Sequence, residues 1–277
     1  MKQAEHALMN QMNIGDSNMQ HKLAAQSPYL RCEQLTLTLS NQHILKGVSF
    51  CLPNTGITSL IGPSGAGKSS LLRCITGLNQ TWQGKIVVQG QDVRHWQGGV
   101  DALRQQVGLI AQKPSVFPVS IADNVTFGLS RKERQHHPHA IIQDCLEKAA
   151  LWDEVQHRLN DPARSLSLGQ QQRLCLARAL ALKPSMLLLD EPTASLDPRS
   201  KQLIEASLQQ LATSMPMLCV THDLEQSQRL QGQVIFMCDG KIIEAGTCQD
   251  IFKHPERIET REFLRWSVCD CDTVVQA

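Results

Sequence analysis

The stretch Gly62-Pro63-Ser64-Gly65-Ala66-Gly67-Lys68-Ser69 decides the fold, because it fits the pattern G-x-x-x-x-G-K-[ST] of a phosphate-binding loop. The glycines of such a loop let backbone N–H groups converge on phosphate oxygens, and the helix that follows adds its positive N-terminal end. Lys68 supplies a mobile positive charge, and Ser69 offers a hydroxyl to Mg²⁺. An apolar run over residues 57–61 precedes the loop and a helical pattern from residue 68 to about 76 follows it. We therefore expect a buried strand, the loop and a helix in that order.

A second stretch carries two acids at the end of a predicted strand. Residues 186–189 form an apolar run, and Asp190 and Glu191 follow it directly. A strand of this kind delivers both carboxylates to the edge of the sheet where ligands of α/β proteins bind. Asp190 is placed to hold Mg²⁺ through its water shell, and Glu191 is placed to polarise an attacking water molecule.

The remainder of the chain alternates between strand and helix patterns. Two period-two alternations, over residues 35–39 and 48–52, are joined by a polar turn and predict an antiparallel pair of strands. Further strands are predicted at 84–89, 107–111, 217–220 and 234–237, and helices at 120–129, 138–152, from Asp197-Pro198 onward and at 223–231. This order predicts an α/β fold with a largely parallel sheet, covered on both faces and split by a helical insert.

A charged, His-rich stretch over residues 131–139 separates two of these helices, and we expect it to be a loop. A zinc site at His136, His137 and His139 is the alternative interpretation, since histidines are common zinc ligands.

Composition excludes several classes of protein. The net charge of +1 argues against a nucleic-acid-binding protein, which usually carries a basic excess. The ten cysteines are scattered, so we expect buried or idle thiols rather than a disulfide scaffold. No apolar run approaches the ~20 residues that span a bilayer. Residues 1–28 form a polar extension that we expect to be disordered and that resembles neither a signal nor a transit peptide.

A third stretch indicates the family. Leu166-Ser167-Leu168-Gly169-Gln170-Gln171-Gln172-Arg173 closely resembles the LSGGQ signature of ABC ATPases, with Leu168 where the first glycine usually stands. Gln112 matches the family's Q-loop, Ser195-Leu196-Asp197 its D-loop and His222 its H-switch. The resemblance covers about residues 29–255. It implies a P-loop NTPase fold, the ABC cassette, with a RecA-like core, an antiparallel β subdomain and an α-helical subdomain at about 113–180, all within a domain of residues 29–277.

The resemblance also implies the ligands and the site residues. ATP and Mg²⁺ bind at the phosphate loop together with Ser70, and the metal contacts Ser69, Gln112 and Asp190. Glu191, His222 and Gln112 are the implied catalytic residues. A second copy, arranged head to tail, completes each site with its Ser167 and Gly169, and Gln170 and Asp197 are further implied cofactor-binding residues.

One subgroup of the family is especially similar. The stretches 112–118, 120–125, 148–152 and 170–178 resemble the ATPase subunit of phosphate importers. This implies a homodimer of ATPase subunits at the cytoplasmic face of the inner membrane, held peripherally by two integral-membrane permease subunits whose coupling helices face residues 113–124. A periplasmic solute-binding protein serves the same system without touching this chain. An importer for another small solute and a non-transport soluble ABC ATPase are the alternatives.

Two positions depart from the family pattern. A left-handed backbone at Leu168 would cost roughly 1–2 kcal/mol if that conformation were required, because leucine lacks the freedom of glycine. An aromatic residue of the first hairpin usually stacks on adenine, and Leu39 occupies that place in this chain. The alternative is that Tyr29, the one tyrosine of the sequence, or another aromatic residue folds back to fill the role.

Overall fold

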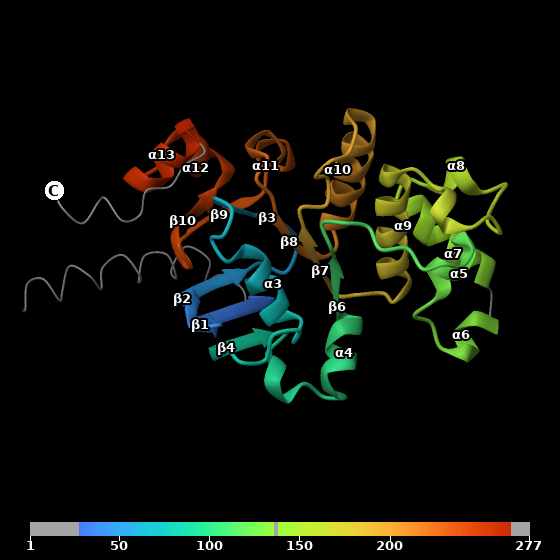
Figure 1. Ribbon diagram of the computed structural model, residues 1–277, viewed down its shortest axis with the longest axis horizontal. Coiled ribbons are helices and arrows are strands. Elements are labelled where there is room, and N and C mark those ends of the chain that lie inside the picture. The colour runs from blue at the N-terminus through green and yellow to red at the C-terminus, as the bar shows by residue number, and fades with distance from the viewer. Residues whose placement is uncertain (1–27, 136–137, 267–277) are drawn as a thin grey trace, which may run out of the picture.

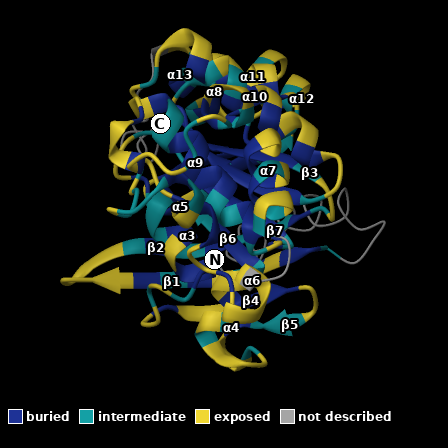
Figure 2. Cartoon of the chain, turned by 90° about the vertical axis from the view of Figure 1, so that its right-hand side faces the viewer, coloured by how far each residue is buried: buried dark blue, intermediate teal, exposed yellow. Residues whose placement is uncertain are grey.

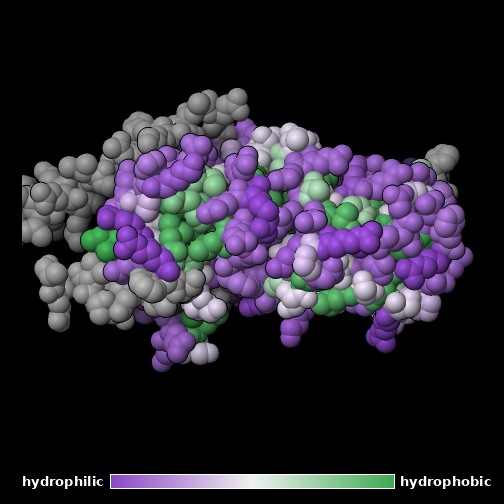
Figure 3. All heavy atoms as spheres, turned by 90° about the horizontal axis from the view of Figure 1, so that it is seen from above, coloured by the Kyte–Doolittle hydropathy of each residue, from purple (hydrophilic) through white to green (hydrophobic). Residues whose placement is uncertain are grey.

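The computed structural model describes residues 28–135 and 138–266 (Figure 1). The predicted N-terminal extension, apart from Pro28, lies outside the described residues, as do His136, His137, Cys269 and Cys271. None of the helices within the described part is long and apolar enough to cross a membrane. The face seen from above in Figure 3 is mostly hydrophilic, and its hydrophobic side chains form separate patches.

A six-stranded sheet forms the centre of the fold, in the order β10-β9-β3-β8-β7-β6. The strands are β3 (Gly56–Ile61), β6 (Val107–Ile110), β7 (Met186–Asp190), β8 (Pro216–Val220), β9 (Gln233–Cys238) and β10 (Lys241–Thr247). All neighbours pair in parallel except β9 and β10, which are antiparallel. The predicted largely parallel sheet is therefore confirmed, and the loops after β3, β6, β7 and β8 leave it at one edge.

A smaller antiparallel sheet, in the order β2-β1-β4-β5, lies beside the phosphate-loop helix (Figure 1). It consists of β1 (Leu30–Leu39), β2 (Gln42–Leu52), β4 (Gln83–Val88) and β5 (Gln91–Asp92), and the helix is α3 (Lys68–Ile75). Inward-facing side chains of β1 and β2 share one buried cluster with Leu71, Leu72 and Ile75 of α3. Burial of this apolar surface fixes the small sheet against the helix that carries the phosphate loop.

The insert between β6 and β7 is helical and occupies one end of the molecule (Figure 1). Its helices are α5 (Ile121–Thr126), α6 (Arg131–Gln135), α7 (Pro138–Lys148), α8 (Trp152–Val155) and α9 (Leu168–Ala181). Their buried residues, including Leu146 and Leu174, join Leu187 and Cys219 of the sheet in a second cluster. Figure 2 shows the buried residues concentrated where sheet and helices meet.

Two predictions for the insert are wrong. Residues 131–135 form α6 rather than a loop, because Ser130 and Glu133 cap each other at its start: the Ser130 N–H donates to Glu133 Oε2 at 2.8 Å. The helix predicted over 138–152 is interrupted, because Ala150 has φ of 51° and the Leu151 N–H bonds the Leu146 carbonyl at 2.8 Å.

Other elements had not been predicted. They are α4 (Gly99–Gln106), α12 (Cys248–Lys253), α13 (Ile258–Trp266), β5 and β10. The predicted helices after residue 197 and at 223–231 are α10 (Pro198–Ala212) and α11 (Leu224–Leu230). Cys238 is disulfide-bonded, which corrects the expectation of idle thiols, whereas the other cysteines of the described residues are free.

Candidate functional site

The phosphate loop is held in a shape that only glycine permits at two positions. Gly67 precedes α3 with φ of 100°, and a Cβ there would lie 2.8 Å from the Ile44 carbonyl oxygen. A Cβ on Gly62 would lie 1.9 Å from the carbonyl oxygen of Met237. The loop is therefore shaped by close contact with β2 and β9, with little room for a side chain at either end.

Lys68 folds into this loop. Its Nζ donates hydrogen bonds to the carbonyl oxygens of Gly62 and Pro63, both at 2.8 Å. Burial lowers the pKa of Lys68, and the nearby Glu191 and Asp190 oppose this by raising it. The charged amine is thus held within reach of any phosphate that the loop cradles.

Two oxygens suited to Mg²⁺ meet beside the loop. Ser69 Oγ donates to Asp190 Oδ1 at 2.9 Å. Burial raises the pKa of Asp190, while the hydrogen bond from Ser69 lowers it. A hydroxyl and a carboxylate are oxygen donors of the type that Mg²⁺ prefers, so this pair fits the predicted metal site.

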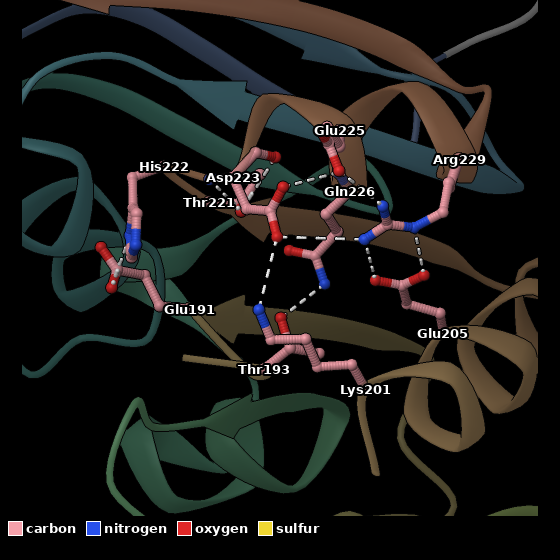
Figure 4. Close-up of polar contacts among 10 residues, drawn as sticks. All are labelled: Glu191, Thr193, Lys201, Glu205, Thr221, His222, Asp223, Glu225, Gln226 and Arg229. Carbon is pink, nitrogen blue, oxygen red and sulfur yellow. Dashed lines mark hydrogen bonds and ion pairs between the residues drawn. The ribbon is translucent and has the colours of Figure 1, made fainter. Parts of the chain in front are cut away.

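Glu191 lies at the meeting point of three catalytic loops. Gln112 Nε2 donates to Glu191 Oε2 at 2.8 Å, and His222 Nδ1 lies 3.1 Å from the same oxygen. Gln112 and His222 thus both contact Glu191, the third residue predicted to be catalytic. Gln112 lies two residues after the end of β6. Figure 4 shows His222 and Glu191 facing each other from separate loops.

The backbone of Glu191 is strained. Its φ of 49° is left-handed, which is uncommon for a residue with a side chain. The Glu191 N–H donates to the Val220 carbonyl at 3.0 Å and holds it in this conformation. A carboxylate fixed in this way beside a phosphate loop is arranged for transfer of a phosphoryl group to water.

The signature residues begin α9 on a separate part of the chain. Ser167 caps the helix: its Oγ accepts from the Gln170 N–H at 3.3 Å, and Gln170 Oε1 accepts from the Ser167 N–H at 3.0 Å. This reciprocal box is a strong start signal and leaves the positive helix end facing outward. Leu168 is absent from the residues with positive φ and lies in the first turn of α9, so the strain considered for it does not arise.

Two residues that the sequence analysis missed support this helix start. Glu154 accepts from Gln170 Nε2 at 2.7 Å and pairs with the buried Arg173 at 2.7 Å. Partial burial raises the pKa of Glu154, but the hydrogen bonds from Arg173 and Gln170 outweigh this and hold it below its usual value. The charged Arg173 within the signature stretch was the sequence feature that could have indicated its pairing with Glu154.

Gly169 lies against the start of α10. A Cβ at this position would lie 2.2 Å from Ser200 Oγ and 2.6 Å from Ser200 Cβ. Asp197 caps α10 by accepting from the Ser200 N–H at 3.0 Å, and Ser195 before it has φ of 63°. The D-loop residues and the signature residues of one chain are therefore in contact with each other.

The predicted adenine position is open, and Tyr29 does not fill it. Leu39 lies at the end of β1 with 37% of its surface exposed. Tyr29 is buried in the cluster beneath the small sheet. Its ring is packed in the core and does not fold back toward a base.

A groove of about 300 Å³ lies on the insert side of the sheet. Phe117 and Phe127 stack there with ring centroids 4.0 Å apart, and the Arg178 guanidinium lies 4.5 Å from the Phe117 ring. Arg104 and Lys113 also line the groove. A half-buried Phe117 stacked on an exposed Phe127, with cations beside them, is typical of a surface that binds another protein.

Known proteins are similar to this chain. The family described as ABC transporter matches residues 45–194. The phosphate import ATP-binding protein PstB of Thermotoga maritima is 41% identical over 244 residues, which cover 86% of this chain and 97% of that relative. PstB of Salinibacter ruber is 37% identical over 242 residues, covering 86% and 97%.

Solved structures share the fold. The structure of cbiO1 from Clostridium perfringens, part of the ABC transporter complex cbiONQ, has a TM-score of 0.72 and 25% identity, and covers 87% of this chain and 97% of that one. A bacterial Atm1-family ABC exporter with ATP bound has a TM-score of 0.75 at 24% identity over 89% of this chain and 43% of that one.

The contact between Gly169 and Ser200 generates a prediction. Gly169→Ala should lower the free energy of unfolding by about 1–3 kcal/mol, because its Cβ overlaps Ser200 and α9 must move away from α10. Thermal unfolding measures the loss. Adding Ser200→Gly removes the clashing atoms and should restore part of the stability, although a helical glycine costs about 0.5–1 kcal/mol relative to alanine. A Gly169→Ala variant as stable as the unsubstituted protein would contradict the packing described.

Proposed function

We propose a function that follows from family membership: this chain belongs to the ABC transporter family of ATP-binding proteins. It hydrolyses ATP as the motor subunit of an importer, and the solute that the importer carries is inorganic phosphate. The observation that carries the hydrolytic part is the contact of Glu191 with both Gln112 and His222 beside the phosphate loop. The phosphate assignment is supported by relatives that bear the name phosphate import ATP-binding protein and match nearly end to end.

The residues of the site divide the chemistry of hydrolysis among them. The phosphate loop from Gly62 to Ser70 and the positive end of α3 bind the triphosphate, and Lys68 exchanges its carbonyl partners for phosphate oxygens. Glu191 acts as general base by accepting a proton from the attacking water, and Gln112 and His222 orient its carboxylate.

Ser69, Gln112 and Asp190 would hold Mg²⁺, which when bound neutralises charge on the phosphate oxygens. The hydrogen bond that joins Ser69 to Asp190 supports this assignment.

A second copy of this chain completes each site. The capped start of α9 is a second terminus suited to an anion, and its own chain packs it against Ser200 rather than against the phosphate loop. Ser167, Gly169, Gln170 and Asp197 of one copy therefore contact the nucleotide held by the other copy, in a head-to-tail homodimer.

Membrane partners hold the dimer at the cytoplasmic face of the inner membrane. The groove at Phe117 and Phe127, next to the phosphate-importer-like stretch 112–125, supports docking of a helix from each of two permease subunits. A periplasmic solute-binding protein belongs to the same system without contact with this chain. An importer for another small solute is the alternative, because the permease subunits choose the solute.

The role of Glu191 gives the first functional prediction. Glu191→Gln keeps the shape of the side chain but cannot accept a proton, so ATP hydrolysis should fall by ~10²–10⁴-fold while ATP binding persists. Steady-state phosphate release and a nucleotide titration measure the two properties. Glu147→Gln, an exposed glutamate on α7, is the matched control and should hydrolyse at the unsubstituted rate. Full turnover by Glu191→Gln would refute the assignment of Glu191 as the general base.

The solute is tested by uptake. Vesicles that contain this chain and its membrane partners should accumulate labelled phosphate only with ATP. Lys68→Ala should reduce that uptake to the level without ATP, since the lost amine is the charge that meets the triphosphate. Phosphate uptake that is unaffected by Lys68→Ala, with uptake of another solute lost instead, would move the assignment to the alternative importer.

Base selectivity follows from Leu39. Base stacking on an aromatic ring is worth ~1–3 kcal/mol, and a leucine offers apolar contact without that stacking. ATP and GTP should therefore bind within about tenfold of each other, since each factor of ten needs ~1.4 kcal/mol. Leu39→Tyr should tighten nucleotide binding, with Leu39→Ile as the control for a changed side chain without a ring. A preference for ATP of a hundredfold or more in the unsubstituted protein would contradict the prediction.

A further inference from the structure

A buried hydrogen bond joins the loop after β7 to the first turn of α11, behind the site. Gln226 Nε2 donates to Thr193 Oγ1 at 2.7 Å, and both residues are buried, with exposed fractions of 0% and 3%. Thr193 follows Glu191 by two residues, and Gln226 follows His222 by four. The bond therefore ties the loop that carries Glu191 to the helix that begins just after His222, as Figure 4 shows.

The segment between His222 and Gln226 is itself fixed. Asp223 caps α11 by accepting from the Gln226 N–H at 2.9 Å, and the Asp223 N–H donates to Thr221 Oγ1 at 3.0 Å. His222 thus lies between two residues whose backbones are tied down. Its own side chain is 63% exposed, so packing restrains it little and its position depends on this backbone.

The far side of α11 is held by α10. Arg229 forms two hydrogen bonds with the buried carboxylate of Glu205, at 2.8 and 2.9 Å, and Gln209 Nε2 donates to the Arg229 carbonyl at 2.9 Å. The hydrogen bond with Glu205 raises the pKa of Arg229. With α11 fixed against α10, the Thr193 bond sets where the helix start lies relative to the Glu191 loop.

We propose that Thr193 and Gln226 are positioning residues that hold His222 at hydrogen-bond distance from Glu191. The inference rests on the proposed hydrolytic function and names residues that act through His222 without touching the reacting atoms. A displacement of about 1 Å in a catalytic group can lower a rate by up to 10²-fold, so the hydroxyl of Thr193 should matter for turnover.

A conservative pair of substitutions tests this. Thr193→Val keeps the shape but removes the hydroxyl, whereas Thr193→Ser keeps the hydroxyl. Thr193→Val should lower kcat by about 10- to 100-fold with KM for ATP within about threefold, and Thr193→Ser should stay near the unsubstituted kcat. Thr126→Val is the matched control, because Thr126 is buried in α5 and its hydroxyl donates to the Ala122 carbonyl of the same helix at 3.1 Å.

A double variant tests whether Thr193 acts through His222. If Thr193 acts through His222, Thr193→Val should cause no further loss in a His222→Ala protein, measured by single-turnover hydrolysis. Losses that multiply in the double variant, or an unchanged kcat in Thr193→Val, would overturn the proposal. Should Thr193→Val fail to fold at the assay temperature, Gln226→Met removes the donor from the other side and must give the same two results.

Measurements on the unsubstituted protein distinguish failure of the positioning proposal from failure of the proposed hydrolytic function. An unsubstituted protein that does not hydrolyse ATP would refute the proposed function. ATP hydrolysis that Glu191→Gln abolishes, but that neither Thr193→Val nor Gln226→Met alters, would leave that function intact and refute the positioning role.

Discussion

The parallel register of β7, β8 and β3 is the constraint on which the site depends. Asp190 pairs with Val220, and Val220 pairs with Leu60, so the three strands end at one level. The ladder then continues past the strands, because the Glu191 N–H bonds the Val220 carbonyl and the Thr221 N–H bonds the Leu60 carbonyl. Backbone hydrogen bonds therefore fix the first residue of the loops after β7 and β8 as firmly as the strands themselves. A flexible connection would leave these residues free to shift.

Beyond those first residues, buried polar contacts take over the role of the ladder. Thr193 with Gln226, and Glu205 with Arg229, link loops and helices that have no strand to align them. Apolar packing is non-directional and tolerates small shifts, whereas a buried hydrogen bond is lost, and its group left unpaired, when the partners move apart. Several buried polar side chains, among them Thr193, Glu205 and Gln226, thus lie in the elements on either side of Glu191 and His222, where orientation matters.

Sequence reasoning identified the residues that we propose bind or react, and it missed those that hold them in place. The phosphate loop, Asp190, Glu191 and His222 have chemistry that a short motif records. Glu154 and Arg173 matter only because α8 and α9 meet, a tertiary contact that no local pattern contains. The helix α6 is a different failure, since its Ser-x-x-Glu start is written in residues 130–133 but was outweighed by the polar composition around it.

Positions 168 and 169 are both glycine in the family signature, but in this chain they differ in whether they can carry a side chain. Position 169 is limited by space, because Ser200 lies where a Cβ would be. Position 168 is limited by neither space nor conformation, since Leu168 begins a right-handed helix and is 47% exposed. In the proposed dimer this leucine lies beside Ser167 on the surface that meets the second copy. There, burial of the exposed half of its side chain would add roughly 0.7–1.5 kcal/mol of apolar contact.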